Sequence, residues 1–284
     1  MAIFFMFIFI IYMIGRVNNL YYYNPVSPPK KVNRPSFGQI KPDMLFIDIQ
    51  GFGKDYNWAN NMIKVIDNSK SKNLPFEHLL DKIEKKYHDC FKNNERVAAK
   101  RTNRESLSVA GRYEGYFDRA EYLVFKHQNK SDNFGISHTR YAEFDPNVEL
   151  ITTGLNWEGY NLTWDHAPPE STPLVMEHIK EIYNGLDSYK ASSKDEKTLS
   201  KINKDVAEIH WYFTQVMPYR NGSAGIADVL TKTIYESLGV QVSPWKKGIA
   251  PDLEALVTPL DEFVKNYESY FTKSPYFMEK HQCI

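Results

Sequence analysis

The run Arg220-Asn221-Gly222-Ser223-Ala224 contains the residue types best suited to binding an anion. Asn and Gly tolerate positive φ, so the run is expected to turn the chain sharply. Ser223 is a favourable N-cap for a helix that begins there. The first amides of a helix lack partners within the helix and lie at the positive end of its dipole. These five residues are therefore the predicted anion-binding site, with Arg220 as its cation; a local surface salt bridge is the alternative role for that arginine.

Met217 and His210 decide what catalysis this turn could support. A methionine thioether cannot accept a proton usefully at neutral pH, so Met217 is interpreted as a core side chain and the catalytic residue stays unknown. His210 lies two turns earlier on the same helical face, about 10 Å along the axis, which is too far for the two side chains to act at the same point. A hydrogen-bonded core histidine is its expected role. Whether His138, Asp165 or His166 approaches the turn is left open.

A helix on each side of the turn must hold it in place. The preceding segment is apolar around most of its circumference, which predicts a buried helix that Pro218 ends. The following segment repeats apolar residues at helical spacing up to Gly239, a typical C′ residue. The apolar positions are Val206, Ile209, Trp211, Phe213 and Val216 before the turn, and Ile226, Val229, Leu230, Ile234 and Leu238 after it.

This helix, turn and helix resemble the core of Fic-domain proteins, whose motif is H-P-F-x-x-G-N-G-R-x-x-R. The matching run, residues 217–226, is two residues shorter in the loop, and Glu208-Ile209-His210 resembles the E-L-H that precedes the family's histidine. Met217 stands where the catalytic histidine would be, and Ser223 and Ile226 stand where the phosphate-binding arginines would be. The AvrB branch of the Fic/Doc superfamily also lacks the full motif, and this chain resembles such a divergent member.

Residues 134–164 alternate β-favouring and polar residues, which predicts a β-hairpin or an irregular flap. In Fic proteins a flap over the site clamps a target segment by edge-strand pairing, a general mode of peptide recognition. The resemblance therefore implies partner contacts for the flap residues. They are Arg140, Trp157, Tyr160 and Trp164, and core packing is the alternative for the aromatic residues among them.

The resemblance implies a secreted effector that modifies a protein target with a donor of the nucleotide or nucleotide-sugar type. Loss of the histidine argues against the standard AMP transfer of the family. The alternative is a catalytically inactive Fic-like scaffold that serves as a protein-binding module. A third hypothesis is an unrelated helical protein whose match is due to chance.

The composition narrows the classes of partner. The chain has 284 residues, with 35 Lys and Arg against 35 Asp and Glu, and this neutral balance argues against a nucleic-acid-binding protein. The basic run 96–104 is interpreted as a solvated helix face. The two cysteines, Cys90 and Cys283, have no zinc-site spacing, so no metal site is predicted, and Cys90 is expected to be buried on a helix.

Residues 1–20 form an apolar N-terminal segment, in which 2–14 are continuously apolar. This run is shorter than a membrane-spanning helix and has the length of a signal-peptide core. A signal, a short anchor with membrane contact, a mis-assigned start and a packing segment all stay open. The protein would be secreted or membrane-anchored in the first two cases and soluble otherwise. Residues 21–43 are predicted to be a Pro-rich linker.

Residues 44–284 are predicted to form one mainly α domain, a Fic-like helical bundle with a small β-hairpin flap. Thr172 is the expected N-cap of the helix after the flap, and Pro173 its first residue. Residues 188–200 are expected to be a polar linker. Besides the two helices of the motif, helices are predicted over 56–69, 75–91, 107–125, 173–186 and 252–271.

Overall fold

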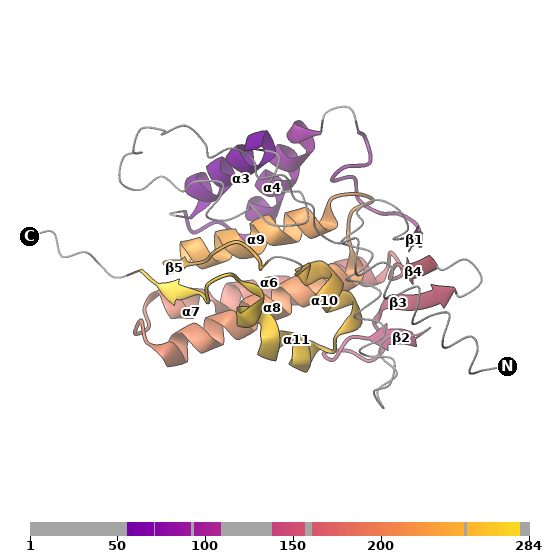
Figure 1. Ribbon diagram of the computed structural model, residues 1–284. Helices are drawn as coiled ribbons and strands as arrows, with labels where there is room; N and C mark the ends of the chain where they lie inside the picture. The colour runs from indigo at the N-terminus through magenta and orange to yellow at the C-terminus, as the bar shows by residue number, and fades with distance from the viewer. Residues whose placement is uncertain are drawn as a thin grey trace, which may run out of the picture. The chain divides into compact units, whose positions relative to one another are not determined.

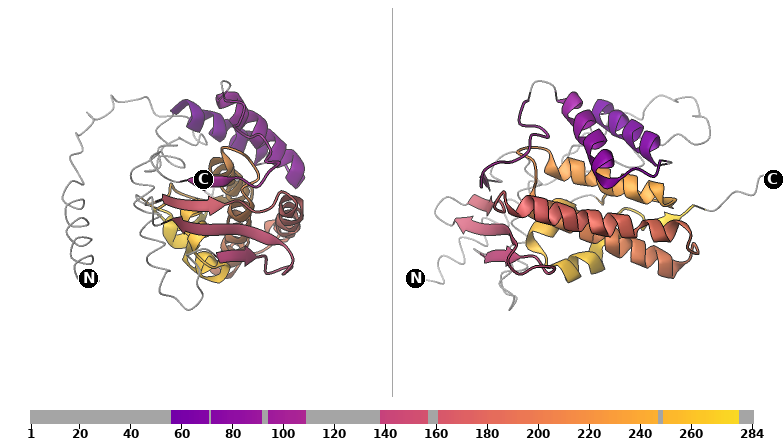
Figure 2. Two further views of the ribbon diagram at one scale, coloured as in Figure 1. Left: turned by 90° about the vertical axis from the view of Figure 1, so that its right-hand side faces the viewer. Right: turned by 180° about the vertical axis from the view of Figure 1, so that it is seen from behind.

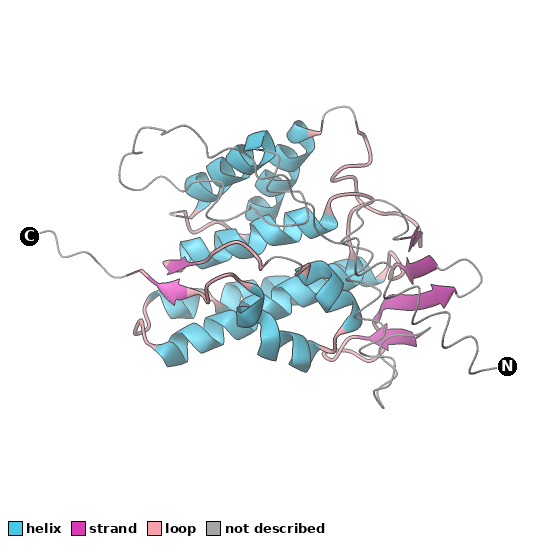
Figure 3. Ribbon diagram, viewed as in Figure 1, coloured by secondary structure: helices cyan, strands magenta, loops and turns pink. Residues whose placement is uncertain are grey.

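The computed structural model describes residues 56–70, 72–91, 94–108, 138–156, 161–246 and 249–278. All of them belong to one compact unit, Ile40–Ile284. Within these ranges the protein is mainly helical with small antiparallel sheets, as the sequence predicts (Figure 3).

Helix α8, Glu196–Val216, is the element around which the others pack. It contacts α6 (Ser171–Gly185), α9 (Ser223–Ser237), α10 (Pro251–Val257) and α11 (Leu260–Asn266) (Figure 1). All residues from Ile209 to Val216 are buried, which confirms the predicted buried helix before the turn. The side chain of Asp195 caps its start by accepting a 2.8 Å hydrogen bond from the Thr198 amide. The predicted linker 188–200 is therefore wrong in extent, because α7 (Asp187–Lys190) and the start of α8 occupy much of it.

Helices α3 (Tyr56–Ser69) and α4 (Phe76–Cys90) pack against α9 on another side (Figure 1). Both agree with the predicted helices. Cys90 is a free cysteine and only partly buried. Helix α9 is enclosed along nearly its whole length, with buried residues from Ser223 to Glu236. The chain leaves α9 through Gly239 at φ 72°, in the left-handed region predicted for a residue that follows a helix end.

A four-stranded antiparallel sheet lies across one end of the helices (Figures 1 and 2). It contains β1 (Ser106–Ser108), β2 (His138–Tyr141), β3 (Glu149–Asn156) and β4 (Asn161–Asp165) in the order β1-β4-β3-β2. The predicted hairpin corresponds to β3 and β4, which pair Thr153 with Trp164. A second, two-stranded sheet joins β5 (Val240–Gln241) to β6 (Tyr276–Phe277).

The structure corrects two of the predicted helices. The helix predicted from 107 is wrong at its start, because Leu107 and Ser108 lie in β1 and pair with β4; the remainder, from 109, lies outside the described residues. The predicted helix 252–271 is divided into α10, α11 and the 3₁₀ helix η2, Tyr267–Tyr270. Pro259 disfavours helical backbone at the preceding residue, and Thr258 is extended at φ −120°, ψ 134°.

Two predicted N-caps are also wrong by one or two positions. Glu170 precedes α6, which begins at Ser171, so Thr172 lies inside the first turn. Gly222 precedes α9 with φ 96°, and Ser223 is its first helical residue. The Ser223 hydroxyl instead accepts a 3.1 Å hydrogen bond from the amide of Tyr219, so it ties the turn together from within.

Candidate functional site

The turn between α8 and α9 begins at a left-handed residue. Met217 follows the last residue of α8 with φ 39° and ψ 70°, a conformation that non-glycine residues rarely adopt. Its side chain is 6% exposed, in agreement with the interpretation as a core residue. The polypeptide reverses between Met217 and Gly222, both of them in the left-handed region, and α9 then starts.

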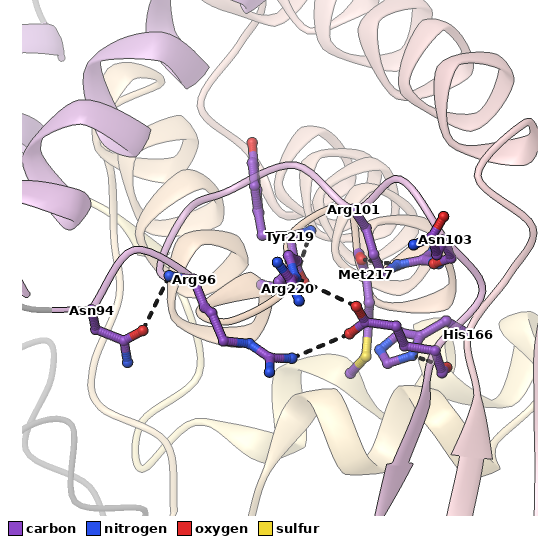
Figure 4. Close-up of polar contacts among 10 residues, drawn as sticks. Asn94, Arg96, Arg101, Asn103, His166, Met217, Tyr219 and Arg220 are labelled. Carbon is purple, nitrogen blue, oxygen red and sulfur yellow. Dashed lines mark hydrogen bonds and ion pairs between the residues drawn. The ribbon is translucent and has the colours of Figure 1, made fainter.

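Arg101 fixes the C-terminal end of α8. Its guanidinium donates from Nη2 to the carbonyl oxygen of Val216 at 2.8 Å and from Nε to that of Met217 at 3.1 Å (Figure 4). A third bond, from Nη1, reaches the carbonyl oxygen of Asn103 at 2.9 Å. Carbonyls at a helix end lack partners within the helix, and a cation there also complements the dipole. Arg101 is 6% exposed, and burial lowers the pKa of its guanidinium.

The segment that contains Arg101 lies directly beside the turn. The amides of Arg220 and Asn221 donate to the carbonyl oxygens of Ala99 and Arg96, at 2.9 and 3.1 Å. In return, the amides of Ala98 and Arg101 donate to Asn221 and Pro218, at 3.0 and 2.9 Å. The interpretation of the basic run 96–104 as a helix face is therefore wrong, because these residues pair with the turn instead of forming a helix.

Two arginines converge on the carboxylate of Glu105. Arg96 Nη2 lies 3.3 Å from Oε2, and Arg220 Nε lies 3.4 Å from Oε1 (Figure 4). The arginine side chains are 53% and 41% exposed, so an ion in solvent can reach both. Nearby Arg104 pairs with Glu149 of β3. The pairing segment thus brings to the turn the positive charge that Ser223 and Ile226 cannot supply.

The start of α9 is covered on one side by Tyr87 of α4. A Cβ atom added to Gly222 would lie 2.7 Å from Cε1 of this tyrosine, and one added to Gly225 would lie 2.4 Å from its hydroxyl oxygen. Only glycine allows the ring to approach so closely. Within the described residues, the amides of Gly222, Ser223, Ala224 and Gly225 donate to no backbone carbonyl, and Gly222 and Ala224 are partly exposed. These four amides are therefore the ones left for a ligand. The amides of Arg220 and Asn221 already donate to backbone carbonyl oxygens.

The histidines near the turn are held by other groups. His210 is 2% exposed, its Nδ1 lies 2.8 Å from the Tyr267 hydroxyl, and burial lowers its pKa to about 3. The predicted core role is confirmed. His166, directly after β4, is 6% exposed; its Nδ1 contacts the backbone oxygen of Glu105, and burial lowers its pKa (Figure 4). The sequence left open whether His166 approaches the turn. The structure places it beside the segment that contains Arg101 and Glu105.

Two of the four predicted flap residues are buried, and the other two lie outside the described residues. Arg140 is 4% exposed and donates from Nη1 to Gln215 Oε1 at 3.0 Å, while burial lowers its pKa to about 9. Trp164 is fully buried, so core packing is the role that the structure gives it. Trp157 and Tyr160 lie outside the described residues. Partner contact through the flap stays a prediction for those two.

The described ranges contain neither a metal-binding cluster nor a membrane-spanning helix. No group of three or more His, Cys, Asp and Glu side chains there is arranged to hold a metal ion. None of the helices in that part of the chain is both long and apolar enough to cross a membrane.

Comparison with known proteins points to one family. The model of the avirulence protein family AvrB_AvrC matches residues 151–274, from β3 into the segment that follows η2. The chain is also 29% identical over 105 residues to avirulence protein B of Pseudomonas savastanoi pv. glycinea. That match covers 37% of this chain and 31% of the relative, so it spans about a third of the relative's length. The similarity agrees with the resemblance to the AvrB branch and includes the turn between α8 and α9.

Proposed function

We propose that this chain is a divergent Fic-like effector that binds a nucleotide-type anion between Arg96, Arg220 and the start of α9, and that acts on a partner protein. The observation that carries the proposal is the convergence of Arg96 and Arg220 on one carboxylate beside that helix start. Two arginines aimed at one acidic group have the geometry with which proteins hold phosphates. The similarity to an avirulence protein supports the effector role.

In this proposal Glu105 occupies the position of the anion until a ligand arrives. A phosphate group carries more negative charge than one carboxylate and gains the amides of residues 222–225 as well, so it competes with Glu105 for the arginines. Arg96 would take the part of the arginine that the motif lacks. Its place in the sequence, more than a hundred residues before the turn, is immaterial because backbone pairing holds it there.

Standard AMP transfer is not part of the proposal. Met217 occupies the position of the histidine in the motif, its side chain is buried, and it cannot accept a proton from a target hydroxyl. The ligand is therefore proposed as a nucleotide or nucleotide sugar, and no described residue is assigned as the catalytic base.

One set of contacts favours the alternative of an inactive scaffold that binds a protein. The amides of Arg220 and Asn221 donate to backbone carbonyls, and both arginines already have Glu105 as a partner. Two amides of the turn and both arginines thus already have partners among the described residues. If nothing displaces Glu105, the same residues serve only to brace the turn.

The two functions are separated by equilibrium binding of ATP, UTP and nucleotide sugars to the full chain. Glu105→Gln removes the competing charge and should tighten binding about 10-fold or more. The double variant Arg96→Ala with Arg220→Ala should weaken binding by about the same factor. Both estimates follow because a charged hydrogen bond contributes about 1.5–3 kcal/mol. Arg104→Ala is the matched control, because Arg104 pairs with Glu149 and not with Glu105.

Incubation of the chain with labelled donors and a partner protein then tests whether a group is transferred to that protein. Absence of nucleotide binding in both the wild type and the Glu105→Gln variant would remove the donor from the proposal and leave the binding module. Binding that is unchanged by Arg96→Ala with Arg220→Ala would place the nucleotide elsewhere on the chain.

A further inference from the structure

The turn between β2 and β3 carries an exposed aromatic ring. Phe144 stacks on His178 of α6, with ring centroids 4.1 Å apart and planes inclined by 25°, yet it is 37% exposed. The buried ring of Tyr212 on α8 supports both, at 5.5 Å from Phe144 and 4.9 Å from His178. Leu174 lies one helical turn before His178, on the same side of α6, and is 54% exposed. We refer to Phe144, His178 and Leu174 together as the aromatic surface.

Carboxylates from three elements lie around this surface. Glu143 precedes Phe144, Glu208 lies one turn before Tyr212 on α8, and Asp261 is in the first turn of α11. Burial raises the pKa of Glu143, and the negative charges of Asp261 and Glu208 raise it further. Like charges that face each other cost free energy unless a cation joins them.

The described residues supply little positive charge to this cluster. Lys204 pairs with Glu208 at 3.2 Å, and the Asp261 carboxylate accepts a hydrogen bond from the Glu262 amide at 2.7 Å. Within the described residues, neither Glu143 nor Asp261 forms an ion pair with a Lys or Arg side chain. His178 lies 3.8 Å from Glu181, but burial lowers the pKa of its ring, so it is largely neutral at pH 7. Among the described residues, an exposed aromatic ring thus stands beside two carboxylates, Glu143 and Asp261, that no Lys or Arg side chain pairs with.

We propose that the aromatic surface and its carboxylates, Glu143, Glu208 and Asp261, bind an arginine-containing segment of a partner protein. A guanidinium is planar and weakly hydrated, so it can stack on Phe144 while it donates to a carboxylate. Leu174 then accommodates an apolar residue of the same segment. Lysine fits less well, because its ammonium is more strongly hydrated and does not stack.

This surface belongs to the partner-directed role proposed above but does not depend on the nucleotide. No residue of the aromatic surface or its carboxylates belongs to the group formed by Arg96, Glu105 and Arg220. A failure of nucleotide binding therefore leaves this inference intact, and a failure here leaves the anion site intact.

The test is fluorescence anisotropy with the full chain and two labelled seven-residue peptides. One alternates leucine and arginine, and the other carries glutamine in place of each arginine. The arginine peptide should bind at least 10-fold more tightly than the glutamine peptide at low salt. Glu143→Gln with Asp261→Asn should weaken binding of the arginine peptide about 10-fold, and Phe144→Ala about 5-fold, in the range of exposed cation–π and ion-pair contributions.

The controls separate local from general effects. Asp89→Asn removes an exposed carboxylate on α4, and Tyr276→Ala removes a 50% exposed ring on β6, so both should bind like the wild type. Because Phe144→Ala also removes packing from Tyr212, the carboxylate variants, which keep the Phe144 ring in place, decide the result if that variant unfolds. Arg96→Ala with Arg220→Ala should bind the peptide normally. Equal binding of the two peptides, no binding by the wild type, or an equal loss in Asp89→Asn would overturn the proposal.

Discussion

The guanidinium of Arg101 lies 3.1 Å from the carbonyl oxygen of Met217, at the point where α8 ends in a left-handed residue. This contact joins two segments separated by 116 positions in the sequence and sets the direction in which the turn leaves the helix. Arg101 thus acts as a C-cap that comes from outside the helix.

Arg101→Ala is expected to destabilise the fold by about 2–4 kcal/mol, because it leaves two buried carbonyls without donors. Arg101→Lys should recover less than half of the loss, since an ammonium cannot reproduce the forked geometry. Urea unfolding measures both. Arg104→Ala is the control and should cost about 1 kcal/mol or less, because Arg104 is exposed and its ion pair is screened. Equal losses at the two positions would contradict a capping role.

Gly225→Ala should destabilise the protein, although alanine normally stabilises a helix relative to glycine by about 1 kcal/mol. The added Cβ would lie 2.4 Å from the Tyr87 hydroxyl oxygen and 2.8 Å from its Cε2, which forces α4 away from α9. We expect a net loss of about 1–3 kcal/mol in thermal or urea unfolding. In a Tyr87→Leu background the same substitution should be neutral or stabilising. An unchanged loss there would mean that Tyr87 is not the cause. Gly185→Ala, where nothing lies within 4 Å of the added Cβ, is the control.

His210 should make the protein sensitive to acid. Burial holds its pKa at about 3 in the folded state, whereas an unfolded histidine titrates near 6.5. Between these values the unfolded chain binds the additional proton, so this contribution to stability is complete above about pH 6.5 and falls as the pH drops toward 3, by at most about 1.4 kcal/mol per pH unit. Lys232, whose charge also lowers this pKa, works in the same direction.

The measurement is the free energy of unfolding of the wild type minus that of His210→Asn between pH 4 and 7. Asparagine keeps an acceptor for the Tyr267 hydroxyl but does not titrate, so the difference should shrink as the pH falls. The subtraction cancels Asp228 and Glu236, whose pKa values burial raises and which act in the opposite sense. A difference independent of pH would disprove the assignment.

Lys232 and Asp228 form an ion pair inside the helical core, 2.9 Å apart on successive turns of α9. The Trp245 indole donates to the same carboxylate at 3.0 Å, and the ammonium lies 4.9 Å from the Trp245 ring centroid. Lys232→Met or Asp228→Asn alone should cost about 3–5 kcal/mol, because each leaves a buried charge without its counterion. The double variant should lose less than the sum of the two in urea unfolding. Additive losses would show that the pair is not coupled.

Met217→His, alone or with Ser223→Arg, is expected to give no AMP transfer. The side chain at position 217 is buried, the turn is two residues shorter than the family motif, and Ser223 braces the turn through the Tyr219 amide. The measurement is incorporation of label from ATP into the chain or a partner protein. Activity gained in Met217→His would contradict this expectation and would show that a histidine at this position can act as the base.

The sequence by itself determined the local features of this protein. Helical periodicity and the glycines at 222 and 239 predicted the two helices and the turn, because spacing and backbone conformation depend on neighbouring residues. The same reasoning gave His210 its core role and residues 134–164 their strands. Helical spacing of apolar residues wrongly predicted one helix over 252–271, because the proline at 259 divides it.

Only the tertiary structure decided what surrounds the turn. Nothing near residues 96–105 in the sequence indicates that they pair with 217–222, that Arg101 caps α8, or that Arg96 and Arg220 share Glu105. These contacts join residues more than a hundred positions apart, and they form because the packed helices bring both segments to one end of the bundle. Side-chain pattern specifies periodicity and burial, but the meeting of distant charges depends on how the whole chain packs.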